Sequence, residues 1–97
     1  VQPNNPLAMN NVAWLMAKQK KPGALEQATR AAQLMPNQPA LLDTLALAQH
    51  RTGDTAKAIE TQNRALAMLP PDYQRQRREM EERLGEYAAA LAPHERE

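Results

Sequence analysis

The side chains best suited to chemistry in this 97-residue chain are two histidines, His50 and His94. His50 stands near the predicted end of a helix and His94 in a C-terminal tail, and neither has a second ligand at metal-binding spacing. The sequence contains no cysteine and no serine, and it lacks a glycine-rich phosphate loop. We therefore expect a protein that is not an enzyme and that binds neither a metal ion nor a cofactor.

Basic side chains gather at one place, Arg75, Arg77 and Arg78, at the start of the last predicted helix. Glutamates follow within one or two turns, and no aromatic residues are interleaved with the arginines to stack bases. The formal net charge is only +1. A solvated helix face is the favoured interpretation, with binding to an anionic surface as the alternative. We expect no nucleic-acid partner, and no apolar run is long enough to span a membrane.

An internal repeat indicates the elements that position these side chains. Segments 24–36 and 58–70 lie thirty-four positions apart, and their matches are Ala24/Ala58, Glu26/Glu60, Arg30/Arg64, Ala31/Ala65 and Pro36/Pro70. A period of thirty-four residues is typical of a helix–turn–helix repeat. Repeats of this kind are stable because each one packs on its neighbours.

Proline and glycine divide the chain into five expected helices: about 6–19, 23–35, a third that opens after Gln38-Pro39 and ends near 51, then 55–69 and 72–91. Apolar residues make up 42% of the chain, with one tryptophan and two tyrosines as the only aromatics. Since alanine supplies much of the apolar fraction, the core is expected to form by close contact between helices through small residues. The last helix carries a narrow apolar stripe made of Tyr73, Met80, Leu84, Tyr87 and Leu91, which is typical of a terminal helix with one side in solvent.

At these positions the chain resembles the tetratricopeptide repeat (TPR) family. The family's pattern of large, small, turn and proline residues falls on Leu42, Leu45-Ala46, Gly53, Ala58, Ala65 and Pro70, and on Met9, Val12-Ala13, Ala24, Ala31 and Pro36. The first repeat departs from the pattern because it lacks the turn glycine and has one extra residue, and Gln62 stands where an aromatic is usual. The resemblance implies an all-α fold, an α-solenoid of two TPR helical hairpins plus a C-terminal capping helix.

The expected organisation is a single TPR domain over 1–97, with repeat 1 at 5–37, repeat 2 at 38–71, a capping helix at 72–91 and a tail at 92–97. The segment Pro3-Asn4-Asn5-Pro6 mirrors the linker Pro36-Asn37-Gln38-Pro39, which predicts that the domain is cut from a longer array. The segments 10–15, 21–26 and 41–45 are also similar to C-terminal repeats of bacterial envelope or exopolysaccharide-associated TPR proteins. That similarity implies a bacterial assembly protein and leaves the compartment open between cytoplasm and periplasm.

In the TPR family the first helix of each hairpin lines a concave groove that contacts peptides. The matching positions here are Asn10, Asn11, Trp14 and Lys18, and then Asp43, Thr44, Leu47, His50 and Arg51. Asparagine can pair with a peptide backbone, Lys and Arg can hold carboxylates, and Trp14 offers a flat apolar anchor. The expected function is a non-catalytic protein–protein interaction scaffold that binds a peptide or protein segment in this groove.

Alternatives stay open for several of these residues. Trp14 can equally pack against a neighbouring helix, and Leu47 can belong to the rim of the core. Lys18 and Arg51 can simply be charges that stabilise the C-terminal ends of helices, or they can form with Asn11 part of a set that holds a C-terminal carboxylate. The alternative function is a structural spacer or self-association module within a larger protein, with exposed apolar residues Leu7, Met9 or Met16 on the first helix.

Overall fold

The computed structural model describes residues 5–91, and within that range the regular secondary structure is all α-helix, joined by short turns. The five helices are α1 (Pro6–Lys18), α2 (Ala24–Leu34), α3 (Pro39–Arg51), α4 (Thr55–Met68) and α5 (Gln74–Leu91). The prediction of an all-α fold with five helices is confirmed, and each predicted helix end lies within two residues of the observed one. The predicted tail, 92–97, and residues 1–4 lie outside the described residues.

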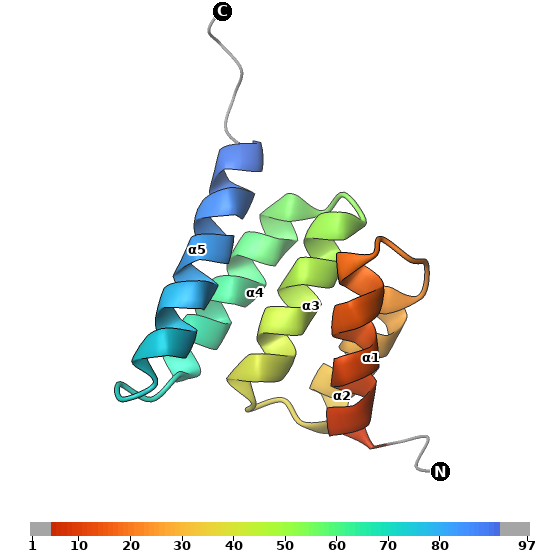
Figure 1. The fold of residues 1–97 in the computed structure, drawn as a ribbon, viewed down its shortest axis with the longest axis horizontal. Helices are drawn as coiled ribbons and strands as arrows, with labels where there is room; N and C mark the ends of the chain where they lie inside the picture. Colours follow the sequence, from red (N-terminus) through yellow and green to blue (C-terminus); the bar gives the residue numbers. More distant parts are fainter. Residues whose placement is uncertain (1–4, 92–97) are drawn as a thin grey trace, which may run out of the picture.

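Successive helices run up and down, so α1, α3 and α5 point one way and α2 and α4 return between them (Figure 1). Each helix packs on the next along the chain, and α1 also packs on α3. This order is compatible with two stacked helical hairpins followed by a single helix. None of the described helices is long and apolar enough to cross a membrane.

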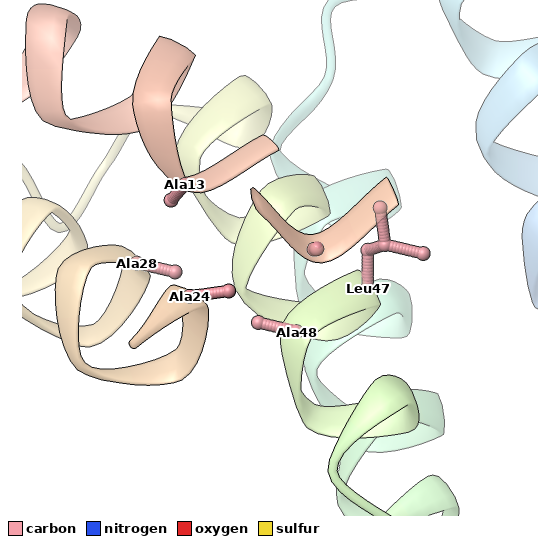
Figure 2. Close-up of a cluster of buried hydrophobic side chains, with 6 residues drawn as sticks. Ala13, Ala24, Ala28, Leu47 and Ala48 are labelled. Carbon is pink, nitrogen blue, oxygen red and sulfur yellow. The ribbon is translucent and has the colours of Figure 1, made fainter. Parts of the chain in front are cut away.

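Small side chains hold the two hairpins together, as the composition predicted. One buried cluster consists of Ala13, Ala17, Ala24, Ala28, Leu47 and Ala48. Figure 2 shows Ala24 and Ala28 of α2 facing Ala48 of α3, with Ala13 of α1 close by. Because an alanine extends only one carbon from the backbone, three helices can approach closely at this point.

Side-chain hydrogen bonds cap the starts of α1 and α4. Asn5 precedes α1, and its Oδ1 accepts from the backbone N–H of Leu7 at 3.0 Å, while Pro6 supplies the first helical residue. Asp54 does the same for α4, where its Oδ1 accepts from the N–H of Lys57 at 3.3 Å. These side chains satisfy amide groups that have no partner inside the helix.

The two hairpin turns share one hydrogen-bond pattern despite their different sequences. After α3, the N–H of Gly53 donates to the carbonyl of His50 and that of Asp54 to the carbonyl of Gln49. After α1, Lys20 donates to Ala17 and Lys21 to Met16, thirty-three positions earlier in each case. Gly53 has φ +96° and Lys20 has φ +58°. Lys20 therefore occupies the left-handed position that glycine normally fills.

Replacing Lys20 with glycine is expected to raise the free energy of unfolding by about 0.5–1 kcal/mol. A left-handed non-glycine residue costs about 1–2 kcal/mol, which exceeds the extra chain entropy of glycine. Urea denaturation followed by circular dichroism would measure the change. Lys21→Gly is the matched control, since Lys21 is an adjacent exposed lysine without a positive φ, and it should destabilise slightly. Equal effects of the two variants would contradict the role given to Lys20.

Only the central residues of the predicted apolar stripe of the last helix are buried against other helices. Met80 and Tyr87 are buried, and Leu84 is half-buried. Tyr73 remains 48% exposed and Leu91 52% exposed. The stripe is longer than the neighbouring helix α4, which has fourteen residues against eighteen in α5, so only its central part has a surface to pack on.

Candidate functional site

The nine predicted groove residues differ widely in their exposure. Asn11, Lys18 and Arg51 are exposed, whereas Asn10, Trp14 and His50 are half-buried. Asp43, Thr44 and Leu47 are buried. The structure thus places the α1 residues nearer to solvent than those of α3. The reason is position, because α3 lies in the middle of the fold and packs on α1, α2 and α4.

Thr44 and Leu47 are both buried and do not face an open groove, and for Leu47 this agrees with the alternative position in the core. The hydroxyl of Thr44 donates to the carbonyl of Ala40 at 3.2 Å, one turn earlier in α3. Leu47 belongs to the alanine cluster shared by α1, α2 and α3, and Figure 2 shows it beside Ala48. Both side chains therefore support the fold from inside.

Asp43, a predicted groove residue, is buried and is the centre of a polar cluster. Its carboxylate accepts from Arg83 of α5 through two bonds, Nε to Oδ1 at 2.9 Å and Nη2 to Oδ2 at 2.5 Å. Gln62 of α4 donates from Nε2 to the same Oδ1 at 2.8 Å and to the carbonyl of Met80 at 3.0 Å. The bidentate geometry is the strong form of this ion pair, and it joins α3, α4 and α5.

Arg83 extends the cluster to the first helix. Its guanidinium carbon lies 4.9 Å from the centre of the Trp14 ring, and the Lys18 ammonium lies 5.7 Å from the same centre. Both distances suit a cation–π interaction. Trp14 is half-buried and also packs against the alanine cluster. It therefore combines the two roles that the sequence left open, packing and a partly exposed aromatic surface.

Arg83 and Gln62 are the residues that sequence reasoning missed. Arg83 stands three residues after Met80 and four before Tyr87, so helical spacing places it on the same face of α5 as these two core residues. That spacing was a usable signal for Arg83. Gln62 is fully buried and stands where an aromatic was expected, which was a usable signal for a buried polar partner.

An apolar cleft of about 420 Å³ opens beside this cluster, between the first half of α3 and the first half of α5. We call it the α3–α5 cleft. Its apolar lining consists of Pro39, Ala40, Met68, Leu69, Pro70, Tyr73 and Met80, and its polar lining of Asn37, Gln38, Asp43, Gln76, Glu79 and Arg83. The cleft thus has apolar walls with one ion pair and several amides at its edges, a composition typical of binding sites.

The charged side chains that line the cleft are two carboxylates and one guanidinium, so the lining carries one excess negative charge. The Asp43 carboxylate is matched by the Arg83 guanidinium, and Glu79 adds a further negative charge on the exposed side of α5. Three lining residues have amide side chains, Asn37, Gln38 and Gln76, which can both donate and accept hydrogen bonds. The cleft therefore favours an apolar ligand that carries a positive charge and peptide-like polar groups.

His50 lies near the end of α3, away from the α3–α5 cleft at the start of this helix, and it packs against α5. Its Nδ1 is 2.9 Å from the hydroxyl of Thr55, and its ring centre is 4.8 Å from that of Tyr87. Burial, together with the charge of Arg51, lowers the pKa of His50 below its usual value of 6.5. Burial also raises the pKa of Tyr87 to about 12. Both rings are therefore neutral near pH 7 and act as packing groups.

The arginines at the start of α5 are not equivalent. Arg77 donates from Nη2 to the carbonyl of Leu69 at 3.1 Å, which satisfies a backbone group beyond the end of α4. Arg75 and Arg78 are exposed. One of the three charges that defined the anionic-surface alternative is thus engaged in holding the turn between α4 and α5.

Comparison of the chain with models of protein families, with curated proteins and with solved structures found no match.

Proposed function

We propose that this chain is a non-catalytic protein-binding module of the TPR type, and that it holds an extended segment of a protein partner in the α3–α5 cleft. The observation that carries the proposal is the cleft itself, about 420 Å³ between apolar walls, bordered by amides and by the Asp43–Arg83 pair. This volume is within the usual range for ligand sites. This binding surface lies between α3 and α5, whereas the predicted groove residues lie on α1 and α3.

The partner segment carries apolar side chains next to a lysine or arginine. The apolar side chains fit between Met68, Tyr73 and Met80, where their burial removes apolar surface from water. The basic side chain is placed beside Glu79, whose charge is not matched by the Asp43–Arg83 pair. A guanidinium has five N–H donors, and Asp43 takes two from Arg83, so donors remain for a backbone carbonyl of the segment.

A substitution that fills the α3–α5 cleft tests whether peptides bind there. We expect a peptide library displayed against the chain to enrich sequences with adjacent apolar and basic residues. Ala40→Trp places a large ring at the cleft and should weaken the binding of the enriched peptides at least tenfold, because it occupies the volume that they need. Fluorescence polarisation of labelled peptides would measure the dissociation constants.

Ala56→Trp is the matched control. Ala40 and Ala56 are both exposed, and each is the second residue of its helix, but Ala56 does not line the cleft. The control should bind like the parent chain. Equal affinities for the parent and Ala40→Trp would contradict the proposal, as would enrichment of acidic peptides, which Glu79 disfavours.

A further inference from the structure

Arg83 connects the α3–α5 cleft to a helix that does not line it. From α5 its guanidinium bonds Asp43 of α3, and it belongs to the polar lining of the cleft. The carbon of the same guanidinium lies 4.9 Å from the ring centre of Trp14 on α1. Helices α1 and α5 stand on either side of α3 (Figure 1), so the two side chains meet across α3. Trp14 itself does not line the cleft.

The contacts with Asp43 and Trp14 restrict the guanidinium in different ways. Its five N–H groups point outward in one plane. Asp43 takes two of these groups and so fixes one edge of the plane. A planar group that is held along one edge can still tilt about that edge. The Trp14 ring attracts the positive charge over its face and restricts this tilt, so the two contacts together fix where the free N–H groups point.

Trp14 is a suitable support because the core holds it in place. Its side chain is half-buried and packs against the alanine cluster, which includes Leu47, one turn after Asp43 on α3. The ring is thereby fixed relative to Asp43. The Arg83 side chain is only 22% exposed, and a cation–π contact is stronger where water is partly removed. The Arg83–Trp14 contact is therefore stronger than one at an open surface.

A second cation lies at the same ring, on the exposed surface of α1. The Lys18 ammonium is 5.7 Å from the centre of the Trp14 ring, and Lys18 does not line the cleft. The two cations distinguish two uses of the ring. If Trp14 affects binding in the cleft, it does so through Arg83, whereas a ligand that touches the ring directly also meets Lys18.

We propose that Trp14 is a positioning residue for the α3–α5 cleft. Its ring holds the Arg83 guanidinium in the orientation in which the free N–H groups of Arg83 reach a backbone carbonyl of the bound segment. This role rests on the peptide-binding function proposed above. The affinity of the cleft then depends on a side chain of α1 that the partner does not touch.

The first measurement uses the isotopically labelled full chain without a ligand. In nuclear magnetic resonance spectra the Nε–H of Arg83 should exchange with water more slowly than those of the exposed Arg75 and Arg78, because it is bonded to Asp43. Trp14→Leu should accelerate this exchange about fivefold or more, whereas Trp14→Phe, which keeps an aromatic face, should stay within about twofold of the parent. Equal exchange rates in the parent and in Trp14→Leu would contradict the hold of Trp14 on Arg83.

The second measurement is the affinity for the peptide that the library enriches most strongly, labelled for fluorescence polarisation. Trp14→Leu should weaken its binding about fivefold or more, and Trp14→Phe should keep most of the affinity. Lys18→Met is the matched control, since it removes the other cation at the ring, and it should bind like the parent. Equal losses in Lys18→Met and Trp14→Leu would overturn the proposal, because the peptide would then contact the ring directly.

The same peptide shows whether Trp14 acts through Arg83. The Asp43→Leu/Arg83→Met double variant removes the guanidinium without leaving an unpaired charge, and it keeps the apolar walls of the cleft. Adding Trp14→Leu to this variant should change the affinity less than about twofold, because the side chain that Trp14 positions is absent. A further loss as large as that in the parent chain would overturn the proposal.

A fluorinated tryptophan separates the ring's charge distribution from its packing. Trp14 is the chain's one tryptophan, so an analogue supplied during expression replaces it alone. Fluorine draws electron density from the ring face and weakens its attraction for a cation, while the shape of the ring stays nearly the same. This chain should bind the peptide more weakly than the parent. An unchanged affinity would contradict the role of the ring face, even if Trp14→Leu failed to fold.

The proposed function and the role of Trp14 fail in different ways. A parent chain that binds no enriched peptide, or binds it no better than Ala40→Trp does, would overturn the proposed function and the role of Trp14 with it. A parent chain that binds the peptide in the cleft, with the same affinity as Trp14→Leu, would overturn only the role of Trp14.

Discussion

Replacing Tyr87 with alanine is expected to lower the free energy of unfolding by about 3–5 kcal/mol, the range for loss of a buried aromatic ring. Tyr87 is 1% exposed and is one of the largest fully buried side chains described. Its ring packs against Ala46 of α3 and Ala58 of α4, two side chains too small to fill the space that it would leave. Urea denaturation of the full chain would measure the loss.

Tyr73→Ala and Tyr87→Phe are the controls for this prediction. Tyr73 is 48% exposed, so its removal should change stability by less than about 0.5 kcal/mol. The hydroxyl of Tyr87 is buried without a hydrogen-bond partner among the described residues, so Tyr87→Phe should match or slightly exceed the stability of the parent. A loss below about 1 kcal/mol in Tyr87→Ala would show that α5 does not depend on this ring.

The Tyr87 hydroxyl also predicts that the stability of the parent chain, but not of Tyr87→Phe, falls at high pH. In the fold the pKa of Tyr87 is raised to about 12 by burial, against the usual value of 10.0. Below pH 10 the phenol is neutral in both states, and the stabilisation is complete. Between pH 10 and 12 the unfolded chain loses the proton first, so the parent should lose up to about 2–3 kcal/mol. Tyr87→Phe should not show this loss.

The helices of this chain could be predicted because their ends are encoded locally. Asn5 and Pro6 start α1 through contacts within three residues, and Gly53 ends α3 by its own backbone freedom. The alanine core was predictable for a similar reason, since a repeat of thirty-four residues places the same small residues at each contact. Lys20 shows the limit of this reasoning. A lysine gives no sign that its backbone is left-handed, and only the comparison with the second turn reveals it.

The candidate site was harder to predict because its contacts join distant parts of the chain. The Asp43–Arg83 pair connects residues forty positions apart. Helical spacing indicates that Arg83 is on the buried face of α5, but it does not indicate which residue of another helix is its partner. Helical spacing predicts which residues share a face, but it does not predict how many neighbours cover that face. For this reason Asn11 of α1 is exposed, whereas the matching Thr44 of α3 is buried.

Asp43→Ala is expected to lower the free energy of unfolding by about 2–4 kcal/mol. The substitution removes both bonds to Arg83 and leaves a half-buried guanidinium unpaired, and it also removes an acceptor from the buried amide of Gln62. Loss of one partner of a buried pair is costly because the other partner keeps its desolvation penalty. Asp72→Ala, at an exposed aspartate, is the control and should stay within about 0.5 kcal/mol of the parent.

The fluorescence of Trp14 can report the effect of Asp43→Ala on the position of Arg83. It is the chain's one tryptophan, and Arg83 lies over its ring at 4.9 Å. If Asp43 holds Arg83 in this position, Asp43→Ala should shift the Trp14 fluorescence, whereas Asp72→Ala should not. The Asp43→Leu/Arg83→Met double variant distinguishes pairing from packing. Since it leaves no unpaired charge, it should recover much of the stability lost in Asp43→Ala. If the double variant is no more stable than Asp43→Ala, apolar packing cannot replace the ion pair. The bonds of Asp43 to Arg83 and Gln62 would then themselves hold α5 against α3.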